Sequence, residues 1–163
     1  MRVKVGEAER RSMAGWLETR GFTHFVTLAF NPNKLGMVGT GHTLLLGGSQ
    51  RAVRRLQEWD ARVNRRALGR RWSKKVDERM RAAAFLEHPR TNTHWHLLAL
   101  PPVVPEPSGF VHFMEAEWRK LEPNGTVQIE PIYDSKQLSR YVTKELGDPE
   151  CWEHFELLGP RIS

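Results

Sequence analysis

The chain has 163 residues, of which 39% are hydrophobic and 27% charged, and it contains a single cysteine. This composition is typical of a globular domain and excludes an internal disulfide or a cysteine-rich zinc site. The 25 lysines and arginines outnumber the 19 acidic residues, giving a formal net charge of +6 that favours a polyanionic partner.

Nothing in the sequence indicates a second domain or a membrane segment. No apolar run approaches the roughly 18 residues of a membrane-spanning helix, and the first residues, MRVKVGEAERRSM, lack the apolar segment of a signal peptide. Repeats, linkers and low-complexity stretches are also missing. We therefore expect one domain over residues 1–163, in a cytoplasmic protein without a membrane partner.

The first part of the chain predicts a helix, a strand and a loop. Residues 7–19 are good helix formers with apolar residues at helical spacing, and Gly21 is expected to end this helix. Residues 22–30 (FTHFVTLAF) are rich in β-branched and aromatic types and predict a strand. Residues 31–48 contain an Asn-Pro pair and five glycines, so we expect a loop there.

Residues 49–68 show the clearest helical pattern, because apolar residues recur every three or four positions along one face. Around that face lie six arginines: Arg51, Arg54, Arg55, Arg62, Arg65 and Arg66. A charged run is usually a solvated helix face. Because Glu58 and Asp60 are the only acids in this stretch, we instead predict that the six arginines contact the phosphates of a nucleic acid.

The second part of the chain predicts an antiparallel hairpin followed by a helix, a strand and a helix. In chain order these elements are strands at 81–88 and 94–100, a helix at 108–121, a strand at 125–133 and a helix at 134–146. The segment PRTNT is the hairpin turn, and Asp134 is the expected N-cap of the last helix. Residues 151–163 add a short strand or lie across the domain. This order predicts an α+β fold with an antiparallel sheet covered by helices.

His94 and His96 are separated by one residue in a predicted strand, so their side chains point to the same face. Glu87, near the end of the partner strand, is placed to lie across from them. Two imidazoles and a carboxylate leave positions open on a divalent ion, and Mn²⁺, Co²⁺ or Zn²⁺ suits two nitrogen ligands better than Mg²⁺. The alternative is a pair of ordinary half-exposed histidines. His88 would face away from Glu87 and is a reserve candidate only.

Tyr141 and Lys144 lie three residues apart in a predicted helix and therefore share one face. A tyrosine hydroxyl is a poor nucleophile unless its proton is removed or its target is activated. A metal ion on a scissile phosphate and a nearby ammonium group would supply much of that activation. The alternative is a packing tyrosine beside a solvated lysine.

With FVTLAF, HWHLLAL and YVTK in this order over residues 22–146, the chain resembles the HUH endonucleases. Within them it resembles the single-tyrosine replication initiators (Rep proteins) of rolling-circle plasmids and phages. The resemblance implies a five-stranded antiparallel sheet with ferredoxin-like or RNA-recognition-like topology. It also implies that His94 and His96, with Glu87 as third ligand, bind Mn²⁺ or Mg²⁺. Tyr141 would attack a DNA phosphate to give a 5′-phosphotyrosine and a free 3′-hydroxyl, and Lys144 would position the phosphate or neutralise its charge.

The activity implied by this resemblance is site-specific nicking and joining of single-stranded DNA at a replication origin. Two features of the sequence narrow this expected activity. Gln137 and Glu145 stand one turn to either side of Tyr141, where two-tyrosine members carry a second tyrosine. No G-x-x-x-x-G-K-[ST] phosphate loop occurs, so a separate helicase is the expected partner. Thr27, in the first motif, is most simply a strand residue.

Three other functions remain open on the sequence alone. A small single-tyrosine transposase of the same superfamily would use identical chemistry, although YVTK and Glu145 fit the initiators better. A non-catalytic nucleic-acid-binding module explains the positive charge and the six tryptophans, but leaves the ordered motifs to chance. A metal-dependent hydrolase that uses water leaves Tyr141 without a role.

Overall fold

A computed structural model describes residues 5–31, 41–88, 92–104, 109–147 and 154–160. The helices are α1 (Glu7–Glu18), α2 (Gly41–Leu68), α3 (Phe110–Leu121) and α4 (Ser135–Val142), with short 3₁₀ turns at Trp72–Lys74, Val76–Glu78 and Lys144–Gly147. The strands are β1 (His24–Ala29), β2 (Arg81–Glu87), β3 (His94–Leu100), β4 (Thr126–Pro131) and β5 (Glu156–Leu158). Within these ranges, no helix has both the length and the apolar character needed to cross a membrane.

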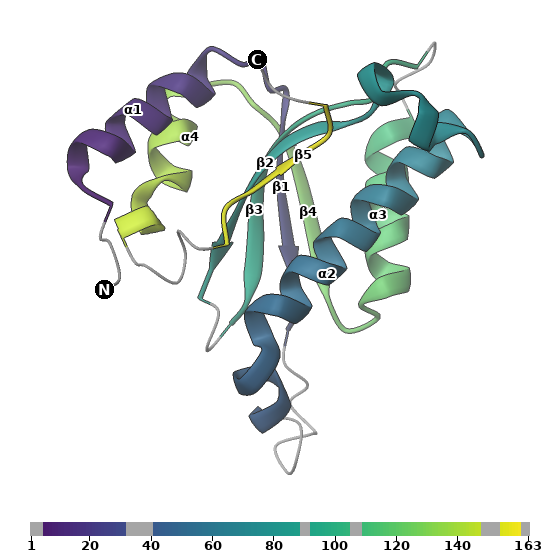
Figure 1. The fold of residues 1–163 in the computed structure, drawn as a ribbon, viewed down its shortest axis with the longest axis horizontal. Coiled ribbons are helices and arrows are strands. Elements are labelled where there is room, and N and C mark those ends of the chain that lie inside the picture. Colours follow the sequence, from purple (N-terminus) through teal and green to yellow (C-terminus); the bar gives the residue numbers. More distant parts are fainter. Residues whose placement is uncertain (1–4, 32–40, 89–91, 105–108, 148–153, 161–163) are drawn as a thin grey trace.

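The five strands form one sheet in the order β4-β1-β3-β2-β5, and all neighbours are antiparallel. The path β1-α2-β2-β3-α3-β4 with strand order 4-1-3-2 is the ferredoxin-like arrangement. Helices α2 and α3 cover one face of the sheet, and α1 and α4 lie on the other side (Figure 1). The α+β fold with an antiparallel sheet, predicted from the element order, and the five strands implied by the resemblance are therefore confirmed, and β5 corresponds to the short strand that was one of two alternatives for residues 151–163.

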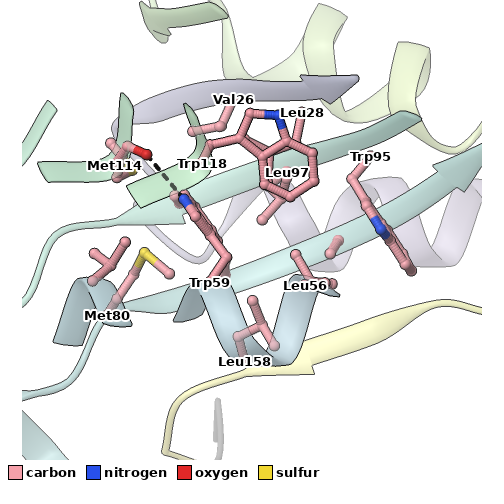
Figure 2. Packing of buried hydrophobic residues seen from close by; sticks show 14 of the residues in the cluster. Val26, Leu28, Leu56, Trp59, Met80, Trp95, Leu97, Met114, Trp118 and Leu158 are labelled. Atoms are coloured by element: carbon pink, nitrogen blue, oxygen red, sulfur yellow. Dashed lines mark hydrogen bonds between the residues drawn. The ribbon is translucent and has the colours of Figure 1, made fainter. Parts of the chain in front are cut away.

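The face under α2 and α3 carries the larger apolar core, shown in Figure 2. Three tryptophans, Trp59, Trp95 and Trp118, are fully buried in it. The indole nitrogen of Trp59 donates to the carbonyl oxygen of Met114 at 3.0 Å, and those of Trp95 and Trp118 donate to backbone carbonyls of α2 and β1. Because each buried indole N–H has an acceptor, these large rings fill the core without an unsatisfied donor.

The opposite face changes from apolar to polar along the β2–β3 hairpin. At one end Ala83 pairs with Leu98, and both pack in an apolar cluster with residues of α1 and α4. Further along, Phe85 pairs with His96, and at the end Glu87 pairs with His94. Side chains in a strand alternate between faces, so this single face brings polar residues together beyond the edge of the apolar cluster.

Two predicted boundaries differ from the structure by more than two residues. The loop expected over residues 31–48 is wrong for 41–48, because α2 begins at Gly41; residues 32–40 lie outside the described ranges. Glycine inside a helix costs only about 1 kcal/mol relative to alanine, and the three consecutive leucines of this segment are good helix formers. The last helix ends at Val142 rather than at 146, and a 3₁₀ turn follows it.

Candidate active site

Glu87, His94 and His96 converge at the polar end of the sheet. The Nε2 atoms of His94 and His96 lie 3.3 Å and 3.4 Å from the same carboxylate oxygen of Glu87, Oε2. One possible ligand atom from each residue lies within 4.8 Å of the others. The three residues predicted as metal ligands are therefore close enough to share one ion.

The second ring nitrogen, Nδ1, of each histidine has a hydrogen-bond partner on the side away from Glu87. Nδ1 of His94 lies 2.7 Å from the carbonyl oxygen of Asn92, which can only accept, so Nδ1 carries the proton. Nδ1 of His96 lies 3.0 Å from the hydroxyl oxygen of Thr27, which can accept or donate. When Nδ1 carries the proton, Nε2 of each ring has a lone pair that can bind a metal, the arrangement that outer-sphere partners support in metal-bound histidines.

The neighbours of Glu87 keep its buried carboxylate ionised. Burial by itself would raise the pKa of Glu87, but contacts with His94 and His96 and the charge of Lys144 hold that pKa well below its usual range. Glu87 in turn raises the pKa of His94. Glu87 Oε1 and His96 Nε2 are buried without a hydrogen-bond partner among the described residues. A buried carboxylate facing two imidazole nitrogens fits a divalent ion with open coordination positions.

Tyr141 and Lys144 both lie beside this group. The ring of Tyr141 lies edge-on to His96 with the centroids 5.6 Å apart, and 43% of the residue is exposed. The ammonium nitrogen of Lys144 lies 3.9 Å from the centroid of the Tyr141 ring and 3.8 Å from Glu87 Oε1. Although α4 ends between Tyr141 and Lys144, the 3₁₀ turn keeps the two side chains together, so the predicted pairing is present.

Helix α4 is anchored on both sides of Tyr141. At its start Asp134 is the N-cap, as predicted, and its carboxylate accepts from the backbone N–H of Gln137 at 2.9 Å. At its end Val142 and Leu146 are buried in the apolar cluster shared with α1. The sequence therefore buries the neighbours of Tyr141 while leaving its own side chain accessible to solvent.

Thr27 has a role that the sequence interpretation as an ordinary strand residue missed. It pairs with His96 in the β1–β3 register, and its hydroxyl holds the imidazole. Phe25, two residues earlier on the same face, stacks on His96 at 5.1 Å and meets Tyr141 edge-on at 6.3 Å. The alternation in FVTLAF places Phe25 and Thr27 on one face of a strand. It does not show that this face meets His96, because β3 is far away in sequence.

The six arginines predicted to bind DNA are not brought to this site. They lie on α2, which packs on the opposite face of the sheet. Four of them pair with acids of α2 or of the end of α3: Arg51 and Arg55 with Glu122, Arg62 with Glu58, and Arg66 with Glu117. The other two, Arg54 and Arg65, are exposed. A contact between α2 and DNA therefore stays a prediction.

His88 does not join the group of three ligands. Its φ of 48° turns the chain out of the strand, and its ring centroid lies 5.4 Å from that of His94. The exposed side chain is a neighbour of the site and not one of the three converging donors.

Comparison with models of protein families, with curated proteins and with solved structures finds no match for this chain. A proposal of function therefore depends on the fold, the side-chain geometry and the motifs described above.

Proposed function

We propose that this protein is a metal-dependent endonuclease that nicks and rejoins single-stranded DNA through a covalent bond to Tyr141. Glu87, His94 and His96 would hold the divalent ion, Mn²⁺ or Mg²⁺. The observation that carries the proposal is the 5.6 Å separation of the Tyr141 and His96 rings. This separation supports the proposal because Tyr141, the proposed nucleophile, and His96, a proposed metal ligand, come from different elements and yet lie side by side.

In the proposed cleavage, the phenolic oxygen of Tyr141 attacks the phosphorus atom, and the bond from phosphorus to the 3′-oxygen breaks. The phenol gives up its proton and the 3′-oxygen gains one, so the products are a 5′-phosphotyrosine and a free 3′-hydroxyl. Rejoining is the reverse reaction, with a 3′-hydroxyl as the attacking group. Because water is not consumed, the phosphotyrosine bond retains the energy of the broken phosphodiester bond, and that energy is available for rejoining.

A bound divalent ion would supply Lewis-acid polarisation of the scissile phosphate. Lys144 lies close to both Glu87 and Tyr141, so its ammonium group is placed to neutralise charge that develops on the phosphate oxygens. Thr27 would act as a positioning residue, since its hydroxyl forms a hydrogen bond with Nδ1 of His96.

The setting that we propose is the initiation of rolling-circle replication of a plasmid or phage at an origin. The contact of Lys144 with both Tyr141 and Glu87 gives the Tyr-x-x-Lys spacing a structural role and supports this choice over transposition. A separate helicase would open the duplex, because the sequence has no phosphate-binding loop of the helicase type.

The test is a search for a covalent adduct with a pool of randomised single-stranded DNA and MnCl₂, analysed on a denaturing gel. The chemistry attaches the protein to the fragment with the new 5′-phosphate. Label at the 3′ end of the strand should therefore move with the protein, while label at the 5′ end should appear in a free fragment. EDTA should abolish both products. Cleavage without an adduct would show a water-dependent nuclease, and binding without cleavage would show a binding module.

A further inference from the structure

Next to Tyr141, on the side of α4 and the β4–α4 connection, the surface is hollowed into a cleft of about 260 Å³. Its lining includes Phe25, Glu130, Tyr133, Asp134, Gln137 and Tyr141. The volume is below the roughly 300–1,000 Å³ of pockets that enclose drug-sized ligands. A cleft of this size suits a single flat group.

The two sides of Tyr141 differ in charge. The ammonium group of Lys144 lies over the Tyr141 ring and faces Glu87, on the side of the metal ligands. Among the described residues that line the cleft, none is a lysine or arginine, and two, Glu130 and Asp134, are acids. A phosphate is therefore favoured on the Lys144 side and repelled from the cleft.

The cleft also offers aromatic surface. Tyr133 is 92% exposed, so its ring is open to a stacking partner. Phe25 and Tyr141 add two further aromatic side chains to the lining. Stacking of bases on aromatic side chains is a general source of affinity in single-strand recognition.

Two polar groups of the cleft are carboxylates, which accept hydrogen bonds and have neighbours that position them. The Glu130 carboxylate accepts from the side-chain amide of Gln128 at 2.6 Å, and the Asp134 carboxylate accepts from the backbone N–H of Gln137. Carboxylates accept hydrogen bonds from the exocyclic amines of bases and oppose the carbonyl oxygens of thymine.

From the cleft beside Tyr141, its Tyr133 ring and its two carboxylates, we infer a pocket for one nucleobase that flanks the scissile phosphate. The pocket selects a base with an exocyclic amine over thymine. This inference rests on the proposed function for its position relative to the cleaved bond. It assigns Tyr133 to stacking and Glu130 to base selection, neither of which takes part in the chemistry.

The test uses the full chain carrying Tyr141→Phe, so that binding is measured without turnover. Fluorescein-labelled dA₁₂, dC₁₂ and dT₁₂ are titrated at one fixed salt concentration and followed by anisotropy. Tyr133→Ala should weaken binding of dA₁₂ by roughly 5- to 150-fold, the range of one stacked base. Tyr133→Phe, which keeps the ring, should retain most of that affinity. Equal affinity of the Tyr133→Ala variant and its parent would overturn the inference.

Base selection is tested with Glu130→Gln in the same background. The parent should bind dC₁₂ at least about fivefold more tightly than dT₁₂, the lower range for one base-edge contact, and Glu130→Gln should bring this ratio toward one. Glu115→Gln, the same charge change on α3 across the sheet, should leave the ratio unaltered. A parent without preference, or an equal change in both glutamine variants, would contradict a base pocket at Glu130.

The results that would contradict the proposed nuclease differ from those that would contradict the base pocket. If no strand is cleaved but the Tyr133 and Glu130 variants change binding as described, the pocket stands as a binding site and the nuclease does not. If adducts form but these variants bind like their parent, the nuclease stands and the pocket does not.

Discussion

Tyr141 and His96 meet ring edge to ring face, with 5.6 Å between centroids and 66° between planes. Phe25 contacts both rings, stacking on His96 and meeting Tyr141 edge-on. The position of the Tyr141 ring therefore depends on aromatic packing and not on its hydroxyl. Removing the hydroxyl alone should leave the packing intact, which makes the role of the tyrosine separable from its contribution to the fold.

Loss of either imidazole should greatly weaken metal binding. His94→Ala and His96→Ala each remove one of three converging donors, so the affinity for Mn²⁺ should fall by more than the roughly 10- to 100-fold typical of losing an outer-sphere partner. Isothermal titration calorimetry measures this directly. His112→Ala, an exposed histidine on α3, should bind Mn²⁺ as the unaltered protein does. If His94→Ala and His96→Ala bind Mn²⁺ as tightly as the unaltered protein, the two histidines are not metal ligands.

Thr27→Val should weaken metal binding without unfolding the protein, because valine matches threonine in shape but cannot accept the hydrogen bond from His96 Nδ1. The expected loss in Mn²⁺ affinity is roughly 10- to 100-fold. Thr27→Ser keeps the hydroxyl and should recover most of the affinity. If valine and serine bind Mn²⁺ equally well, the hydroxyl does not position His96.

The prediction that α2 contacts DNA can be tested on Arg54 and Arg65, which are both exposed. If Arg54 and Arg65 each contact a phosphate, changing both to glutamine should flatten the salt dependence of single-strand affinity by about 1.4 units, or 0.7 for each contact. The measurement is the affinity for dT₁₂ over a range of NaCl concentrations. An unchanged slope would show that α2 is a solvated face, with its ion pairs to Glu58, Glu117 and Glu122 serving stability alone.

Asp60 should make the folded state less stable as the pH rises. Burial raises the pKa of Asp60 to about 7, whereas an unfolded aspartate loses its proton near pH 4. Between these values the folded state binds more protons, so the free energy of unfolding falls as the pH increases toward 7 and then levels off. The full effect is at most about 4 kcal/mol.

Asp60→Asn should remove this dependence, because an asparagine carbonyl can still accept from Asn64, whose side-chain nitrogen lies 2.8 Å from Asp60. Urea unfolding at pH 5 and pH 8 should show a stability gain for Asp60→Asn that is larger at pH 8. Asp77→Asn, at an exposed position, controls for the change in net charge. Equal gains at both pH values would mean that Asp60 titrates normally in the folded protein.

Strand alternation made the convergence of Glu87, His94 and His96 predictable. His94 and His96 share a face because they are two residues apart in one strand, and a short hairpin turn places Glu87 across from His94. Both relationships are local in sequence.

Contacts between distant elements were not predictable in the same way. Thr27 reaches His96 only through the pairing of β1 with β3, and Arg66 reaches Glu117 only because α2 packs on α3. Helical spacing showed that the arginines surround an apolar face, but it could not show that acids of α3 pair with them. The start of α2 at Gly41 was missed because glycine signals a loop more often than a helix.

The central claim is that Tyr141 becomes covalently bound to the new 5′-phosphate, and peptide mapping of the adduct tests it most directly. Trypsin cleaves after Arg140 and Lys144, so Tyr141 and Tyr133 fall in different peptides. After reaction with Mn²⁺ and single-stranded DNA, followed by nuclease and trypsin digestion, mass spectrometry should find the phosphonucleotide on the peptide YVTK. Tyr141→Phe should form no adduct, and Tyr133→Phe should still form one. An adduct on Tyr133, or cleavage that persists in Tyr141→Phe, would contradict the claim.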